Sequence, residues 1–262
     1  MNYLIVSPVR SGSTWLNLTL AKHLKLYNVG ESLCKISPTL LMNSNIKDTS
    51  ISSQLASDIV ISKVVELEKT PIREGNLYAN QNIASKSSLR DLSRDEQIKI
   101  IKKNPFVAKF TPWDLYEDAG GENKFGYEFN KFKELVNPLT TIFLYRKNLL
   151  EHYISFWSVH RTGVMNTNNK FMNYKRPKMK YIQEELDIYL AHKYIWEQCY
   201  KDYKDNFDYT ISYEDLFKMD ELCGVPLKQY HEDFTLKLNR YTKEELEECR
   251  EQTGLEDNYE IC

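Results

Sequence analysis

Near its start the chain reads YLIVSPVRSGST, residues 3–14, and this stretch decides the expected fold. Residues 3–6 form a short apolar run that predicts a buried strand, stopped by the Ser-Pro pair that follows. From residue 13 to residue 26 the apolar spacing predicts a helix, marked by Leu16, Leu20 and Leu24. A strand joined to a helix through a tight loop is the first unit of an α/β fold.

The loop between this strand and this helix is rich in groups that bind anions. Backbone N–H groups at the start of a helix point at an anion, and the helix dipole favours negative charge there. Gly12 lets the backbone approach an oxygen closely. The hydroxyls of Ser11, Ser13 and Thr14 add donors beside the positive charge of Arg10. We therefore expect an anion site here, the alternative being a polar turn that only caps the helix.

The loop resembles in length the nucleotide-triphosphatase loop G-x-x-x-x-G-K-[ST], but its charge differs. Ser7 and Gly12 stand at the two glycine positions, Ser13 at the lysine position and Thr14 at the last position. The lysine that reaches the β- and γ-phosphates is missing. This disfavours an ATPase or kinase and favours another phosphate-bearing ligand. A P-loop kinase of a small metabolite and a non-catalytic nucleotide-binding protein remain as alternatives.

Further apolar runs predict more strands, and the periodic segments between them predict helices. The expected strands are 106–110, 140–145 and 209–211, and the expected helices are 93–104, 127–136, 149–157 and 180–204. Strands that alternate with helices predict a central parallel sheet flanked by helices. We expect one domain over residues 1–262, with a divergent insertion or mobile region around 36–90.

The composition limits the classes of partner. The chain of 262 residues is 42% hydrophobic and 27% charged, with a formal net charge of −2. This balance gives no overall attraction to nucleic acid or to an anionic membrane, so a local group of cations must hold any anionic ligand. The five cysteines lack a C-x-x-C spacing, the histidines lack metal-ligand spacing, and no leader or spanning segment is evident. We expect a cytoplasmic protein with reduced thiols and without a metal ion.

A second motif follows the strand predicted at 140–145. It reads LYRKN, residues 144–148, and is followed by Ser155, nine residues after Arg146. With the loop at residues 10–14, this pair of motifs resembles the sulfotransferases that use 3′-phosphoadenosine 5′-phosphosulfate (PAPS). In detail it is similar to the bacterial trehalose sulfotransferase type. The resemblance implies a P-loop-containing three-layer α/β sandwich and PAPS as the donor, with adenosine 3′,5′-bisphosphate (PAP) as the product.

The resemblance also implies roles for individual residues. The loop would hold the 5′-phosphosulfate, with Arg10 on the leaving oxygen, and Arg146 and Ser155 would hold the 3′-phosphate. Glu31 falls where relatives carry an acidic residue thought to act as the base. Lys109 matches a lysine at the end of a central strand, where it could contact the bridging oxygen or the sulfuryl group. The alternative for Lys109 is a salt-bridged strand terminus.

Three more residues belong to the expected site. His152 is a second candidate for the base, because imidazole titrates near neutrality and the residue lies one turn before Ser155. A plain surface histidine is the alternative. Trp15 and Tyr213 are assigned to the donor site, Tyr213 near the adenine or else as a core aromatic. The acceptor is expected to be a hydroxyl of a carbohydrate or small metabolite, and the oligomeric state stays open.

Overall fold

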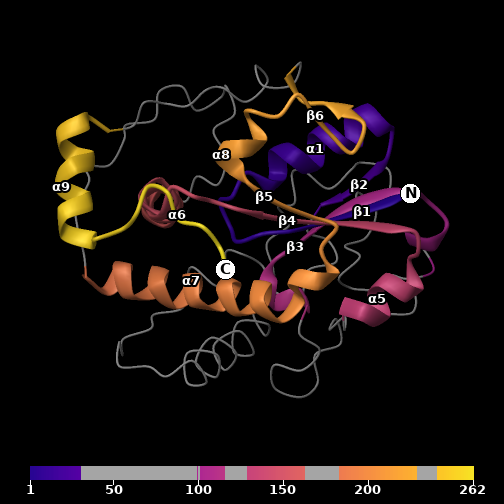
Figure 1. Ribbon diagram of the computed structural model, residues 1–262, viewed down its shortest axis with the longest axis horizontal. Helices are drawn as coiled ribbons and strands as arrows, with labels where there is room; N and C mark the ends of the chain where they lie inside the picture. The colour runs from indigo at the N-terminus through magenta and orange to yellow at the C-terminus, as the bar shows by residue number, and fades with distance from the viewer. Residues whose placement is uncertain (31–98, 100, 116–128, 163–182, 229–240) are drawn as a thin grey trace.

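The computed structural model describes residues 1–30, 99, 101–115, 129–162, 183–228 and 241–262. Its centre is a five-stranded sheet in the order β2-β3-β1-β4-β5, and every neighbouring pair of strands is parallel (Figure 1). The strands are β1 Asn2–Val6, β2 Tyr27–Gly30, β3 Phe106–Phe110, β4 Leu139–Tyr145 and β5 Tyr209–Ser212. The prediction of an α/β fold with a central parallel sheet is confirmed.

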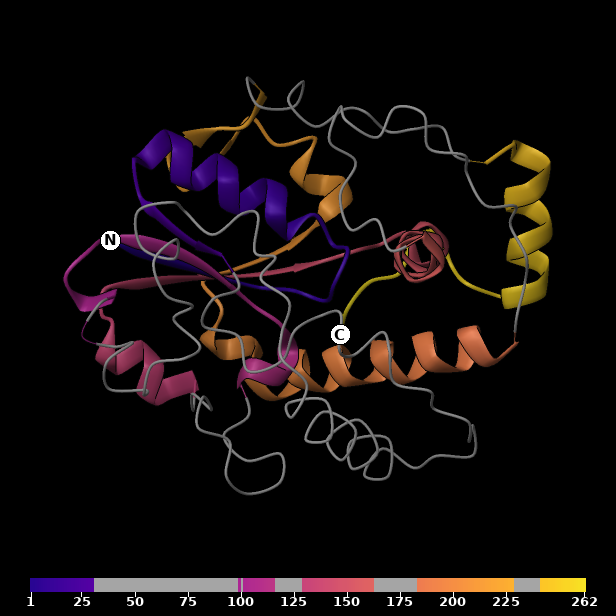
Figure 2. The ribbon, with the colours of Figure 1, turned by 180° about the vertical axis from the view of Figure 1, so that it is seen from behind.

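Helices cover both faces of this sheet. Helices α1 and α8 lie on one side, and α5 and α7 lie on the other, in both opposite views (Figures 1 and 2). The helices are α1 Ser13–Leu24, α5 Phe129–Leu135, α6 Leu149–Thr162, α7 Gln183–Tyr203, α8 Tyr213–Leu216 and α9 Lys243–Thr253, and the 3-10 turns are Pro112–Leu115 and Lys204–Asn206. A small hairpin, β6 Glu221–Leu222 and β7 Val225–Pro226, completes the described elements.

The alternation of side chains along β1 produces two separate layers of core. Leu4 and Val6 pack in the cluster that includes residues of α5, α6 and α7. Tyr3 and Ile5 pack in the opposite cluster, with the apolar side of α1. Because successive strand residues point to opposite faces and both faces are covered, the strand reads as one continuous apolar run. This is why a short stretch of sequence sufficed to predict it.

Most predicted elements are present, with shifted ends. Helix α1 stops at Leu24 instead of residue 26, because Lys25 adopts a left-handed backbone with φ 54°. Strand β2, the hairpin and α9 were not predicted. The regions 36–90 and most of 93–104, which the sequence analysis assigned to an insertion and a helix, lie outside the described residues.

The strand order places the expected site at one edge of the sheet. Strand β1 is central, with β3 on one side and β4 on the other. Residues Val6, Phe110 and Tyr145 end these three strands. Because the strands are parallel, the loops that follow them emerge at the same edge, where ligands bind in open α/β sheets. The loop after β1 is joined to β3 there, since the Ser7 amide donates to the Phe110 carbonyl over 3.0 Å.

Candidate anion-binding site

The loop after β1 contains two residues with left-handed backbones. Arg10 has φ 69° and Gly12, the N-cap of α1, has φ 82°. A Cβ atom on Gly12 would meet Cδ2 of the Tyr213 ring at 2.3 Å and Cε2 at 2.4 Å. Position 12 therefore requires glycine for two reasons, its left-handed backbone angle and the close approach of the Tyr213 ring.

An ammonium group reaches the start of α1 from the neighbouring strand. Lys109 of β3 is only 7% exposed, and its Nζ donates to Oγ1 of Thr14 over 2.9 Å. Ser13, which stands where a nucleotide-triphosphatase loop has its lysine, is also buried. A cation is thus present at the loop although the loop sequence lacks the lysine. The structure brings Lys109 to the first turn of the helix, and its expected contact with a sulfuryl group or bridging oxygen stays a prediction.

Arg146, directly after β4, lies next to the same loop. Its guanidinium is 4.1 Å from the centre of the Tyr213 ring, and Nη1 is 3.2 Å from a carboxylate oxygen of Glu151. Its side chain is 11% exposed. Tyr213 thus contacts Gly12 and Arg146 together. Tyr213, expected near the adenine of a donor or else as a core aromatic, also packs edge-on against Phe217, with centroids 4.8 Å apart.

A hydrogen bond joins the two motifs directly. Nε of Arg10 donates to Oγ of Ser155 over 3.2 Å. Ser155 lies on α6, which begins four residues after the end of β4, whereas Arg10 lies in the loop after β1. Residues from widely separated parts of the sequence therefore meet at one edge of the sheet.

Two buried donors at this edge lack a partner among the residues that the structure describes. They are the hydroxyl of Ser11, which is 0% exposed, and Nε of Arg146. A buried polar group without a hydrogen bond is costly, so such groups mark places where another molecule can bind. A hydroxyl and a guanidinium nitrogen suit the oxygens of an anion. One of them lies in each motif.

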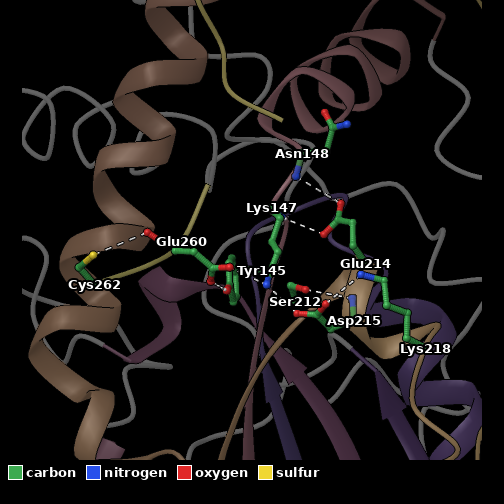
Figure 3. A network of polar contacts seen from close by, with 9 residues as sticks. All are labelled: Tyr145, Lys147, Asn148, Ser212, Glu214, Asp215, Lys218, Glu260 and Cys262. Carbon is green, nitrogen blue, oxygen red and sulfur yellow. Dashed lines mark hydrogen bonds and ion pairs between the residues drawn. The ribbon is translucent and has the colours of Figure 1, made fainter. Parts of the chain in front are cut away.

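The turn between β4 and α6 is held by a carboxylate that the sequence analysis did not assign. Oε2 of Glu214 accepts the Lys147 amide over 2.8 Å, and Oε1 accepts the Asn148 amide over 3.4 Å (Figure 3). These amides follow Arg146 directly. Asn148 also caps α6, since its Oδ1 accepts the Glu151 amide over 2.8 Å. The sequence offered only one indication that Glu214 belongs to the site, its place next to Tyr213. Its hydrogen-bond partners could not be read from the sequence, because β5 must first pair with β4 to bring Glu214 to the turn.

The C-terminal segment also reaches this turn. Nζ of Lys147 lies 2.8 Å from Asp215 and 2.6 Å from Glu260, and the Tyr145 hydroxyl donates to Glu260 over 2.9 Å (Figure 3). Hydrogen bonds to the two carboxylates raise the pKa of Lys147, and the same ammonium lowers the pKa of Asp215. Backbone bonds add to this, from the Tyr259 amide to the Lys147 carbonyl over 2.9 Å.

His152 is fully buried, which corrects the expectation that it faces a cleft or the surface. Its Nε2 lies 2.7 Å from the Val9 carbonyl, and its Nδ1 lies 3.1 Å from the Tyr189 hydroxyl. Burial lowers the pKa of the ring to about 3. Both nitrogens are occupied within the protein, so the ring is not placed to accept a proton from a bound hydroxyl.

Of the remaining expected residues, Trp15 is described by the structure and Glu31 is not. Trp15 is buried, and its ring stacks on Phe217 with centroids 5.1 Å apart. Glu31 lies outside the described residues. Within the described ranges, no three His, Cys, Asp or Glu side chains gather into a group that could hold a metal ion. None of the helices in that part of the chain combines the length and apolar character that crossing a membrane requires.

Comparison with known proteins gives a likeness to solved structures. No family model matches the chain, and no curated protein matches it. Among solved structures, the chain is similar to a sulfotransferase domain from the curacin biosynthetic pathway, with 13% identity and a TM-score of 0.39. The match covers 100% of this chain and 98% of that domain.

The buried histidines make stability depend on pH. Burial lowers the pKa of His152 to about 3 and that of His192 to about 4, whereas an unfolded histidine titrates near 6.5. Between these values the unfolded chain binds more protons, so folding stability falls as the pH falls below about 6.5. At pH 5 we expect a loss of roughly 2 kcal/mol for each histidine relative to pH 7.5. Urea unfolding at both pH values measures this loss.

Because carboxylates also titrate in this range, a variant isolates the histidine contribution. His192→Leu removes one of the two buried imidazoles and should lessen the decrease between pH 7.5 and pH 5 by roughly 2 kcal/mol. The same decrease in the variant and in the wild type would contradict the prediction.

Proposed function

We propose that the protein is a sulfotransferase that moves a sulfuryl group from PAPS to a hydroxyl of a carbohydrate or small metabolite. The observation that carries the proposal is the contact between its two anion-binding motifs, through Nε of Arg10 and Oγ of Ser155. PAPS carries anionic groups at both its 5′ and 3′ positions. A site for such a donor needs two cationic elements close together. The loop with Arg10 and the segment with Arg146 and Ser155 meet this need.

Each motif would hold one end of the donor. The loop after β1 would bind the 5′-phosphosulfate through its backbone N–H groups and the Ser11 hydroxyl, which is buried without a partner in the described part of the chain. Arg146 and Ser155 would bind the 3′-phosphate. Nε of Arg146 is likewise buried and has no described partner. An arginine is suited to this task because its planar fork matches phosphate oxygens.

The proposed reaction is an in-line displacement. The acceptor oxygen forms a bond to sulfur while the bond from sulfur to the 5′-phosphate oxygen breaks, and PAP leaves with the electron pair of that bond. Negative charge grows on the leaving oxygen, where Arg10 and Lys109 would stabilise it. The acceptor hydroxyl gives its proton to a base, for which the proposal uses Glu31.

A thermal-shift comparison of ligands tests the donor. PAP at a hundred times its dissociation constant stabilises a folded protein by about 2.7 kcal/mol, which corresponds to roughly 5–10 °C in Tm for a chain of this size. We expect this shift with PAP, a smaller one with AMP, and none with ATP and Mg²⁺. A shift with ATP and Mg²⁺ but none with PAP would favour the kinase and reject the sulfotransferase. Binding of PAP without turnover of PAPS would favour a non-catalytic protein.

The same measurement with Arg146→Ala locates the 3′-phosphate. In the wild type PAP should bind about 100-fold more tightly than AMP, which lacks that phosphate, because a buried charged contact is worth about 2–3 kcal/mol. In the variant the two ligands should bind almost alike. Arg250→Ala is the matched control, because Arg250 also pairs with a carboxylate, at 2.6 Å from Asp257, but lies on α9.

A further inference from the structure

A buried imidazole contacts the loop between β1 and α1, residues 7–12, which we call the anion loop. His152 lies on α6 and is 0% exposed, and its Nε2 is 2.7 Å from the carbonyl oxygen of Val9. Val9 immediately precedes Arg10 in the loop. Ser155, one turn further along α6, contacts the Arg10 side chain. The same helix therefore touches the loop at its backbone and at its side chain.

The partners of the ring set its tautomer. A carbonyl oxygen only accepts hydrogen bonds, so Nε2 must carry a proton and donate it to Val9. Burial keeps the ring neutral, so Nδ1 holds a lone pair and accepts from the Tyr189 hydroxyl over 3.1 Å. The Leu149 carbonyl lies 3.2 Å from the same hydroxyl, which has a single proton, so that proton points to Nδ1 when Nε2 donates to Val9. The Val9 carbonyl thus fixes which nitrogen of His152 donates to the loop, and the Tyr189 hydroxyl holds the other nitrogen.

The bond to Val9 acts on the strained part of the loop. Its carbonyl belongs to the peptide group that joins Val9 to Arg10, and φ of Arg10 describes rotation about the bond from this group to the Arg10 Cα. That angle is 69°, in the left-handed region, which residues with a side chain seldom occupy. Because the peptide group is planar, holding its oxygen also fixes the direction of the Arg10 N–H.

We propose that His152 is a positioning residue that holds the anion loop in its binding shape by donating from Nε2 to the Val9 carbonyl. The inference rests on the proposed function for the identity of the anion. It gives His152 no part in proton transfer. The residue acts through the backbone of the loop, and Tyr189 keeps the ring in place by its contact with Nδ1.

Two substitutions separate the nitrogens of the ring. In His152→Gln the side-chain amide nitrogen falls near the place of Nε2 and can donate to Val9. In His152→Asn it falls near the place of Nδ1, and the Val9 carbonyl loses its donor. We expect His152→Asn to weaken PAP binding about tenfold and to speed hydrogen exchange of the amides in residues 7–14 about tenfold. His152→Gln should stay within about twofold of the wild type in both measurements.

His192→Asn is the matched control. His192 is a second buried histidine, and its ring packs against Phe156, 5.3 Å between centroids. This variant should lower Tm as His152→Asn does, but leave loop exchange and PAP affinity unchanged. Equal effects of the two asparagine variants on the loop would overturn the proposal, because they would reflect lost packing alone.

Other outcomes are equally decisive. A His152→Gln variant that loosens the loop as much as His152→Asn overturns the role of the Val9 bond. Variants that keep the loop and PAP affinity but lose turnover show that His152 is a base, which also overturns the proposal. If the wild type does not bind PAP, the sulfotransferase assignment falls, while the exchange rates of the ligand-free variants still decide the role of His152.

Discussion

Replacing Arg10 with alanine or asparagine is expected to lower kcat for sulfuryl transfer by about 10²–10³-fold. Nε of Arg10 is 3.2 Å from Oγ of Ser155. In the proposed reaction this guanidinium stabilises the charge that grows on the leaving oxygen. Removing a donor that acts on developing charge costs the transition state more than the bound donor substrate, so kcat should fall more than the affinity for PAP. Single-turnover transfer with PAPS and PAP titration measure the two quantities.

Two variants are needed because Arg10 has a left-handed backbone, φ 69°. Alanine is disfavoured in that conformation, whereas asparagine tolerates it. If activity depends on the charge, both variants lose it. If it depends only on the backbone, asparagine retains it. Lys25→Asn is the control, since Lys25 is another basic residue with a left-handed backbone, φ 54°, at the other end of α1, and should keep full activity.

Gly12→Ala is expected to lower the free energy of unfolding by about 3 kcal/mol and to abolish donor binding. A left-handed backbone costs an alanine about 1 kcal/mol, and overpacking adds about 1–3 kcal/mol. The overpacking arises because the new Cβ would meet the Tyr213 ring at 2.3 Å. To relieve this clash, either the Tyr213 ring moves and displaces Arg146, which stacks on it, or the loop itself moves. Urea unfolding and PAP titration of the variant measure both effects.

Gly224→Ala separates the two contributions. Gly224 has almost the same backbone angle, φ 77°, but a Cβ there would meet nothing within 4 Å. It should cost only about 1 kcal/mol and leave PAP binding intact. If both variants lost the same free energy of unfolding, the Tyr213 ring would move aside without an energetic cost. The contact between Tyr213 and Gly12 would then have no role in the site.

The sequence predicted the parts of the fold that local pattern determines. Strands β1, β3 and β4 were evident because both of their faces are covered, as the burial of Leu4 on one face and Ile5 on the other illustrates. Strand β2 was missed because it is only four residues long and contains Asn28 and Gly30, which are uncommon in strands. Helix α9 was missed although its capping box, Thr242 with Glu245, was present in the sequence.

Four residues that lie together in the candidate site were chosen from the sequence, but their contacts could not be predicted from it. Arg10, Lys109, Arg146 and Ser155 were chosen from sequence, and the structure gathers them at one edge of the sheet. The surface or cleft position expected for His152 was wrong, because its burial depends on α7 packing over α6. No local pattern in the chain reports that packing.

Strand β1 comes first in the sequence but lies in the middle of the sheet, and this determines when its partners become available during synthesis. Tyr3 pairs with Val107 on one side and with Thr140 on the other. Until the ribosome has released β3, the apolar run of β1 has no partner strand, and its second edge stays unpaired until β4 is released, so it remains a target for chaperones. Contacts so distant in sequence also slow folding. The segment made early is thus completed late, and the candidate site forms only after Ser155 and Tyr213, which follow β4 in the chain, have also been released.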